Sequence, residues 1–277
     1  MSGRDPVSAI RWRMILEKRK KYLQIALNNT LEDARQIVAS LPHSRNILIE
    51  AGTPLIKKSG TQAISAIREL APNAYIVADI KCADLADREV GLVCDIQPSF
   101  APVLPNPRLT QKNSFLDLLK MTADQINAIQ KNSQANLSVP AVTSSANAAT
   151  VLGVAPVETI NLFIEECKKR RIDSMIDMMN VANPLAILKK LDYPPDVVIL
   201  HRGVDETEFS REKQIPYYQI KQIKGNYNIL VAVAGGDTIR EIQRAFFNDA
   251  DIVVVWKNFY QATENTALLA KEFLKEI

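Results

Sequence analysis

The sequence predicts a single (β/α)8 barrel, an α/β fold in which parallel strands alternate with helices. Short apolar runs alternate with amphipathic stretches of helical period along the chain. Eight such units fit within 277 residues, which is the length of one barrel domain. Polar residues follow the apolar runs, at the strand ends where barrel enzymes carry their chemistry. An open, doubly wound sheet is the alternative architecture.

The composition is that of an ordinary globular protein. Hydrophobic residues make up 47% of the chain and charged residues 23%, and a net charge of +3 is too mild to indicate nucleic acid. Three well-separated cysteines, Cys82, Cys94 and Cys167, form no metal-spaced pair and leave an odd count. No apolar run reaches membrane-spanning length, and the N-terminus is not a secretory signal. The sequence therefore predicts a cytoplasmic protein without a membrane or nucleic-acid partner.

The predicted organisation is an N-terminal basic helix within residues 1–21 and a barrel over residues 22–277. The helix, over residues 6–21, has a narrow apolar stripe. It could lie on a membrane surface, but we expect it to close the bottom of the barrel. The first three strands are expected at residues 23–27, 47–49 and 75–79, each followed by a helix, at 31–38, 61–70 and 85–93. Thr30 is expected to cap the first of these helices.

The alternation is interrupted at about residues 94–146. A proline-rich stretch is followed by a helical segment, residues 115–129, with one apolar face, and then by polar chain. A connection of this length is typical of a functional lid, an interface element or partly disordered chain. We interpret it as an insertion after the third unit.

The remaining units resume the pattern. Strands are expected at 148–153, 174–178, 197–200, 229–233 and 252–255. Helices are expected at 157–169, after Asn183-Pro184, at about 206–224, at 239–247 and at 263–275. The polar groups at the carboxyl ends of the predicted strands are Asn28, Glu50, Asp79, Lys81, Asp177, His201, Gly235, Gly236 and Lys257.

Glu50 and Asp79 end adjacent strands, so their carboxylates can converge on one point. Two hard oxygen ligands with water suit Mg²⁺, which rarely has a complete protein cage. Lys81 lies two residues beyond Asp79 and points the same way if the strand continues. It could hold a developing enolate oxygen or carry a proton. A salt bridge between Glu50 and Lys81 is the alternative.

Two further groups follow later strands. His201 could move protons, because the pKa of histidine lies near working pH, or it could be a hydrogen-bonded rim residue. Gly235-Gly236 precedes a predicted helix after the seventh strand. Glycine lets backbone N–H groups approach an anion, and barrels commonly bind phosphate near the seventh and eighth strands. The sequence thus predicts an anion site at this loop.

These residues together resemble a known superfamily. Asp79-x-Lys81-x-x-Asp84, with Glu50-Ala51-Gly52-Thr53-Pro54-Leu55 one strand earlier, is similar to the orotidine monophosphate decarboxylase superfamily. Further segments most resemble 3-hexulose-6-phosphate synthase; these are Ile176-Asp177-Met178-Met179-Asn180-Val181, the run from Val198 to Asp205, and the run from Val231 to Gly236. The similarity covers about residues 22–93 and 147–277. The Glu50 motif is similar to the metal-using sugar-phosphate branch.

The resemblance implies a homodimeric lyase that condenses ribulose 5-phosphate with formaldehyde, or runs the reverse reaction. It implies Mg²⁺ held by Glu50 and Asp79 and by substrate oxygens. It implies that Lys81 and His201 stabilise and protonate an enediolate, and that the loop carrying Asp84 reaches the partner's active site. The remaining implied contacts are Asn28, Arg202 and Asp205 to the substrate, and Gly235, Gly236 and Lys257 to the phosphate.

The chain departs from the family pattern at three places. Asn28 stands where the family has an aspartate at the end of the first strand. Trp256 and Lys257 stand where it has Gly-Arg, and lysine binds phosphate as a point charge rather than bidentately. The insertion replaces a short turn. Two alternatives therefore remain open: a barrel with another substrate, such as a β-keto sugar-acid phosphate or another aldehyde, and a non-catalytic paralogue that uses the insertion as a partner surface.

Overall fold

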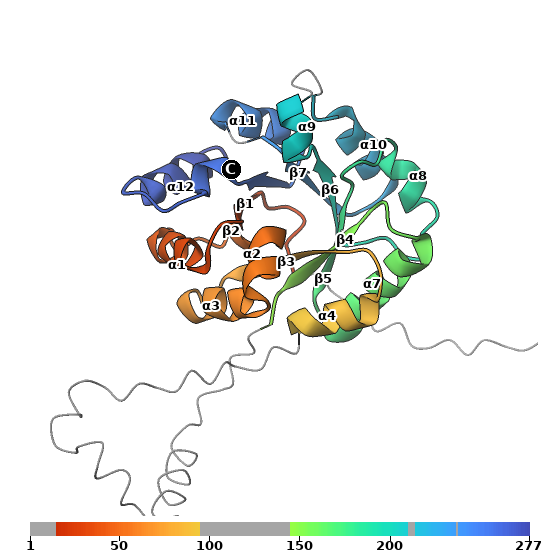
Figure 1. Cartoon of the computed structure of the whole chain (residues 1–277). Coiled ribbons are helices and arrows are strands. Elements are labelled where there is room, and N and C mark those ends of the chain that lie inside the picture. The colour runs from red at the N-terminus through yellow and green to blue at the C-terminus, as the bar shows by residue number, and fades with distance from the viewer. Residues whose placement is uncertain (1–14, 95–144, 210–213, 237) are drawn as a thin grey trace, which may run out of the picture. The chain divides into compact units, whose positions relative to one another are not determined.

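The computed structural model describes residues 15–94, 145–209, 214–236 and 238–277. The chain divides into one unit of residues 1–96 and 144–277 and another of residues 97–143, which lies outside the described part. The predicted insertion, with its helix at 115–129, and residues 6–14 of the predicted N-terminal helix therefore lie almost wholly outside it. Within the first unit, eight parallel strands close into a barrel in the order β1 to β8, which confirms the predicted fold (Figure 1).

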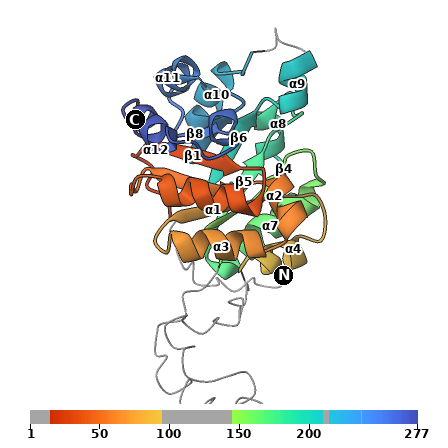
Figure 2. The ribbon, with the colours of Figure 1, turned by 60° about the vertical axis from the view of Figure 1, so that its left-hand side comes forward.

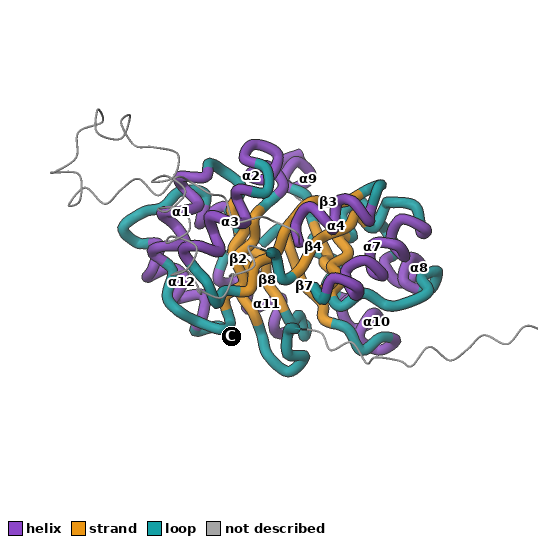
Figure 3. The backbone as a smooth tube through the Cα atoms, turned by 90° about the horizontal axis from the view of Figure 1, so that it is seen from below, coloured by secondary structure: helices purple, strands orange, loops and turns teal. Residues whose placement is uncertain are grey.

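The strands agree closely with the sequence prediction. They are β1 (Tyr22–Leu27), β2 (Ile47–Ala51), β3 (Tyr75–Cys82), β4 (Ala148–Leu152), β5 (Asp173–Asp177), β6 (Val197–His201), β7 (Leu230–Ala234) and β8 (Ile252–Val255). Closure follows from the parallel pairing of β1 with both β2 and β8. Seen from below, the strands form the centre and the helices surround them (Figure 3).

The helices cover the outside of the strands. They are α1 (Leu31–Ser40), α2 (Thr53–Ser59), α3 (Gln62–Leu70), α4 (Ala86–Cys94), α7 (Val157–Arg170), α8 (Pro184–Leu188), α9 (Val204–Phe209), α10 (Tyr218–Asn226), α11 (Ile239–Phe247) and α12 (Thr266–Leu274), with a 3₁₀ turn η1 (Lys257–Phe259). α12, α1 and α3 follow one another along the outside of the barrel (Figure 2). Within the described ranges, no helix is long and apolar enough to cross a bilayer.

Three helix predictions need correction. Residues 15–21 of the predicted N-terminal helix form bends and turns, because the backbone N–H groups of Ile15 and Leu16 donate to the buried Asp173 carboxylate. The predicted helix at 206–224 is two helices, α9 and α10. The extra helix α2 begins after Gly52, with proline near its first position, a start signal that the sequence contained.

Side chains alternate along each strand between two cores. One core lies between the strands and the outer helices, and the other fills the barrel interior. Leu16 closes that interior from the N-terminal side and is 6% exposed. Inward-facing Leu48, Val77 and Met175 belong to the interior core. Two residues further along the same strands stand Glu50, Asp79 and Asp177, so the polar groups continue the inward face at the carboxyl end.

Candidate active site

Asp177 joins the two strongest catalytic candidates. Lys81 Nζ lies 2.7 Å from Asp177 Oδ2, and His201 Nδ1 lies 2.9 Å from the same oxygen. The backbone N–H of Met179 donates to the other oxygen at 2.9 Å. Asp177 is 1% exposed, so its charge is compensated by protein groups rather than by water. The sequence marked Asp177 as a strand-end residue but gave it no role.

Lys81 is held between two carboxylates. Its Nζ is 3.1 Å from Asp79 Oδ2 as well as 2.7 Å from Asp177. Lys81 has a φ of 47°, and the pairing of β3 with β4 shifts register between Ala78 and Cys82. The backbone irregularity accompanies a side chain that reaches across from β3 to the end of β5. The predicted shared direction of Asp79 and Lys81 is confirmed, and the alternative pair of Lys81 with Glu50 is wrong.

Two threonines fix the Asp79 carboxylate. Thr53 Oγ1 donates to Oδ2 at 2.8 Å, and Thr150 Oγ1 donates to Oδ1 at 2.7 Å. Thr150 also accepts the backbone N–H of Lys81 at 3.0 Å. Asp79 is 7% exposed, so it has little freedom to rotate. Thr53, at the start of α2, lies within the Glu50-to-Leu55 motif but was given no role, and no sequence motif indicated Thr150, in the middle of β4.

Glu50 lies deeper in the barrel mouth and is held by Gln24. Gln24 Nε2 donates to Glu50 Oε2 at 2.5 Å, and both side chains are buried. Burial, followed by the nearby negative charge of Asp79, raises the pKa of Glu50 to about 7. Oε1 accepts no hydrogen bond from any described residue. The sequence identified Glu50 but not Gln24, which is one buried polar residue within an apolar strand.

The donor set suits a magnesium ion that takes few protein ligands. Two carboxylates repel each other, one keeps an open oxygen, and Mg²⁺ normally completes its shell with water and substrate. Within the part of the chain that the structure describes, no three His, Cys, Asp or Glu side chains form a metal-binding group. Glu50 and Asp79 could therefore hold an ion together with substrate oxygens, but not as a complete protein cage.

The electrostatic environment favours the charged forms of Asp177, His201 and Lys81. Burial alone would raise the pKa of Asp177, but the hydrogen bonds and charges of His201 and Lys81 outweigh it and the pKa falls well below its ordinary value. Burial likewise lowers the pKa of His201, and Asp177 reverses this, so that the net shift is upward. The pKa of Lys81 is raised by Asp79 and Asp177 against the same opposing effect of burial. Lys81 is thus an ammonium ion at neutral pH.

The residues expected to contact the substrate follow strands β1 and β6. Asn28 packs so tightly against Gly52 that a Cβ at position 52 would lie 1.9 Å from the Asn28 amide oxygen. Asp205 is exposed at the start of α9. Arg202 Nη2 donates to the carbonyl oxygen of Gly235 at 2.7 Å, so this side chain contacts the glycine loop.

The predicted phosphate loop follows β7. Gly235 has a φ of 105°, where a side chain would be strained, and a Cβ there would lie 2.5 Å from the Arg202 carbonyl oxygen. Gly236 precedes α11, whose first turn begins at Thr238. Lys257 is exposed in η1, and the ring of Trp256 packs edge-on against Tyr260 with centroids 5.9 Å apart. The structure therefore places the glycine loop beside an arginine that directly follows β6.

Asp84 lies apart from the central cluster. It is exposed in the turn before α4, and its carbonyl oxygen accepts the Cys82 thiol at 3.3 Å. Leu85 beside it has a φ of 50° and is 56% exposed. The expectation that this loop reaches a second subunit stays a prediction.

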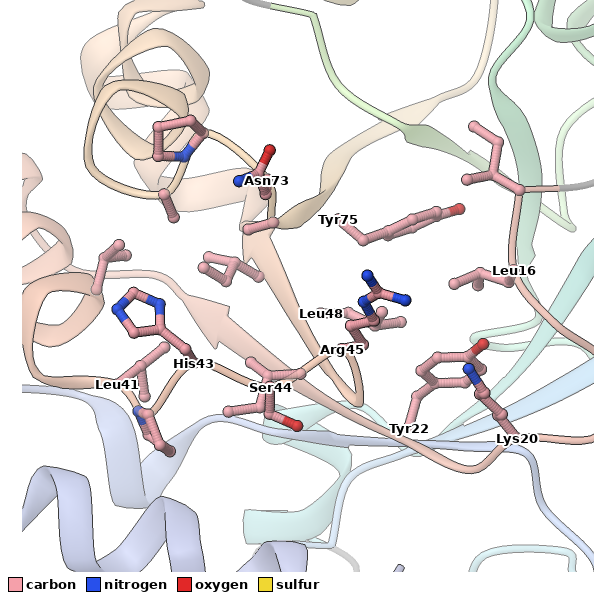
Figure 4. A pocket seen from close by; sticks show the side chains of 18 of the residues that line it. Leu16, Lys20, Tyr22, Leu41, His43, Ser44, Arg45, Leu48, Asn73 and Tyr75 are labelled. Carbon is pink, nitrogen blue, oxygen red and sulfur yellow. The ribbon is translucent and has the colours of Figure 1, made fainter.

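A separate cavity of about 610 Å³ lies at the opposite end of the strands. Tyr22, Arg45, Leu48 and Tyr75 are among the residues that line it (Figure 4). Tyr75 OH donates to Asp173 at 2.7 Å, so this wall is part of the network that holds residues 15–16. The cavity is remote from Lys81 and Asp177, because it lies at the amino ends of the strands and these two residues lie at the carboxyl ends.

Comparison with known proteins agrees with the fold. Residues 21–91 match the family model described as Orotidine 5'-phosphate decarboxylase / HUMPS family. The predicted resemblance is confirmed. The bifunctional enzyme Fae/Hps of Methanocella arvoryzae is 34% identical over 247 residues, which are 88% of this chain and 50% of that protein. The chain spans about half the length of the curated relatives it matches.

Solved structures show the same barrel. 3-Hexulose-6-phosphate synthase from Salmonella typhimurium superposes with a TM-score of 0.66 at 22% identity, covering 92% of this chain and 97% of that one. 3-Keto-L-gulonate-6-phosphate decarboxylase from Vibrio cholerae gives a TM-score of 0.63 at 16% identity, covering 93% and 97%. At these identities the superposition supports the fold, and the assignment of chemistry depends on the site.

Proposed function

We propose that the chain is a carbon–carbon lyase of the hexulose-6-phosphate synthase type. It would join ribulose 5-phosphate to formaldehyde, or cleave the hexulose 6-phosphate in the reverse direction. The arrangement that carries the proposal is Lys81 between Asp79 and Asp177, with His201 on the other side of Asp177. It provides a fixed cation and a proton carrier at one strand-end site, the groups that an enediolate reaction needs.

His201 is the proposed carrier of the proton that leaves C1 of the substrate. Its Nδ1–H donates to Asp177, which fixes the ring and leaves Nε2, unengaged by the described residues, for the substrate. Nε2 takes the proton from C1 of the ketose, and the electrons of that C–H bond form the enediolate. The enediolate carbon then attacks the carbonyl carbon of formaldehyde. His201 returns the proton to the new alkoxide, so that no proton is gained or lost overall.

Lys81 supports the negative charge of the enediolate. Its ammonium group is kept charged by two carboxylates and is positioned before substrate arrives, so little reorganisation is needed. Bound Mg²⁺, held by Glu50 and Asp79, would supply Lewis-acid stabilisation of the enediolate oxygens. Gln24, Thr53 and Thr150 hold the two carboxylates in place. The phosphate of the substrate would lie at Gly235-Gly236 near Arg202.

The test is a direct assay of the purified chain with ribulose 5-phosphate, formaldehyde and Mg²⁺. We expect consumption of both substrates and formation of a hexulose phosphate. The Lys81→Met and His201→Gln variants should lose most of the activity when each is assayed below its own melting temperature, with circular dichroism showing that it is folded. A parallel assay follows CO₂ release from 3-keto-L-gulonate 6-phosphate. Carbon dioxide release without formaldehyde consumption would contradict the proposal and favour the decarboxylase alternative.

The homodimer and the Mg²⁺ requirement are part of the proposal. Sedimentation of the full chain measures the first, and titration of the EDTA-treated protein with Mg²⁺ measures the second. If Asp84 reaches a partner subunit, Asp84→Ala should lower turnover without disturbing the Lys81–Asp177 pair. Retention of full activity in that variant would count against a shared site.

A further inference from the structure

The glycine loop after β7 is held by Arg202. The guanidinium Nη2 donates to the Gly235 carbonyl oxygen at 2.7 Å. The backbone of Arg202 is equally close, since its carbonyl oxygen would lie 2.5 Å from a Cβ at position 235. The main chain and the side chain of Arg202 thus both lie against the loop. A guanidinium is well suited to bind phosphate through two hydrogen bonds.

A carboxylate stands at the same loop. Glu241 Oε1 lies 3.7 Å from Arg202 Nη2. Glu241 Oε2 accepts the backbone N–H of Thr238 at 3.1 Å and the Thr238 hydroxyl at 2.9 Å, which completes a capping box at the N-terminus of α11. The approach is close, because a Cβ at Gly236 would lie 2.9 Å from the Glu241 Cβ.

Glu241 thus contacts both positive features of the loop. A phosphate at a helix N-terminus uses free backbone N–H groups and the positive end of the helix, and an arginine beside it adds a charged hydrogen bond. Here a protein carboxylate accepts one of those N–H groups and is paired with that arginine. A dianionic phosphate entering the loop meets a fixed negative charge a few ångströms from the cation that would receive it.

We propose that Glu241 is a specificity-determining residue, an internal anion that competes with the substrate phosphate for Arg202 and for the N-terminus of α11. The inference depends on the proposed function only in placing the phosphate at Gly235-Gly236. The loop then binds phosphate less tightly than its glycines and arginine alone would. Part of the affinity for a phosphorylated sugar must come from contacts at the sugar end.

The test uses Glu241→Gln in the full chain. Glutamine keeps the length of the side chain and an oxygen that can accept from Thr238, so the capping box survives while the charge is removed. Inorganic phosphate is the probe, measured by calorimetry and as a competitive inhibitor. We expect the phosphate Kd to fall about three- to tenfold, as expected from removing one partly screened charge at this range. For the phosphorylated substrate, the change should appear in KM rather than in kcat.

Two matched variants complete the experiment. Glu158→Gln removes the same charge from an exposed position in the first turn of α7 and should leave phosphate binding unchanged. Arg202→Met in the Glu241→Gln background should abolish the gain. Phosphate binding that is equal or weaker in a folded Glu241→Gln variant would overturn the inference, even if the lyase activity is present. Tighter phosphate binding without any lyase activity would support the inference and refute the proposed function.

Discussion

Asp177 Oδ2 lies 2.7 Å from Lys81 Nζ and 2.9 Å from His201 Nδ1, so one buried oxygen connects the cation and the proton carrier of the site. The three residues lie at the carboxyl ends of strands that are not all neighbours: β3, β5 and β6. The link across the barrel mouth makes the charge states of Lys81 and His201 depend on each other through Asp177.

The first prediction concerns Asp177→Asn. Asparagine keeps the shape but removes the charge that raises the pKa of His201, so that pKa should fall. A histidine acting as base must be neutral, and the acid limb of the kcat/KM profile should therefore move to lower pH. We expect turnover to fall about a hundredfold or more, since both catalytic groups lose their orientation. The measurement is kcat/KM from pH 5 to pH 9.

The control for this prediction is Asp192→Asn. Asp192 is an exposed carboxylate that accepts from Asn161 at 3.0 Å, in the loop between α8 and the amino end of β6. It should change neither the turnover nor the pH profile. An Asp177→Asn enzyme with the wild-type acid limb would show that Asp177 does not set the protonation of His201.

The second prediction concerns the stability of the metal-free protein and Glu50. Its pKa is raised from 4.5 to about 7 in the fold, chiefly by burial and then by Asp79. The folded state therefore binds more protons than the unfolded state between these values, and the free energy of unfolding should decrease as pH rises from 4.5 to 7. The loss is on the order of 3 kcal/mol at most. Glu50→Gln should remove this part of the pH dependence and be more stable than wild type at pH 8.

Urea unfolding at pH 5 and pH 8 in EDTA measures this difference. Asp173, whose pKa is raised to about 6 by burial, contributes to both proteins and cancels in the comparison. Adding Mg²⁺ at pH 8 should stabilise wild type but not Glu50→Gln. A Glu50→Gln variant that is less stable than wild type at pH 8 in EDTA would mean that the ionised Glu50 carboxylate does not destabilise the fold.

The barrel and most of this site could be predicted because both depend on the alternation of inward- and outward-facing side chains along each strand. Inward-facing residues repeat every second position, so the sequence placed Glu50, Asp79 and His201 at the strand ends together. The role of Asp177 could not be predicted, since it depends on Lys81 reaching across from β3 to β5, next to a register shift after Ala78 that the sequence did not indicate.

The features that the sequence did not predict depend on contacts between residues far apart in the chain. The N-terminal segment had helical periodicity, but Ile15 and Leu16 donate their backbone N–H groups to Asp173, a residue 157 or more positions away. A buried tertiary acceptor outweighs weak local helix propensity. Gln24 was missed because one polar residue in a strand carries no information about its partner. The contact with Glu50 appears only when β1 and β2 are in register.

The third prediction tests the support of Asp79. Thr150→Val keeps the shape of the side chain but removes the hydroxyl that donates to Asp79 and accepts from the Lys81 backbone. We expect a loss of about 1–3 kcal/mol in unfolding free energy, because buried polar groups lose their partner. Turnover should fall more than about tenfold, since Asp79 and Lys81 both lose their alignment.

Thr266→Val is the matched comparison. Thr266 is also buried, and its hydroxyl accepts the Thr263 backbone N–H at 2.8 Å, at the start of α12 and away from the site. It should cost a similar amount of stability while turnover is kept. Equal losses of turnover in the two variants, measured well below both melting temperatures, would mean that Thr150 acts only through general stability.

The last prediction concerns the segment between α4 and β4. The backbone N–H of Ala146 donates to the Val93 carbonyl oxygen at 2.9 Å, so the chain leaves and re-enters the barrel at adjacent points. The buried Arg68 fixes the re-entry by donating to the Ser145 carbonyl oxygen and to Asn147. A short linker can therefore replace residues 97–143 without straining α4 or β4. We expect the shortened chain to keep its melting temperature within a few degrees, together with its lyase activity. Loss of turnover in a shortened chain with unchanged stability would instead make residues 97–143 part of the catalytic or assembly function, because the barrel itself would be intact.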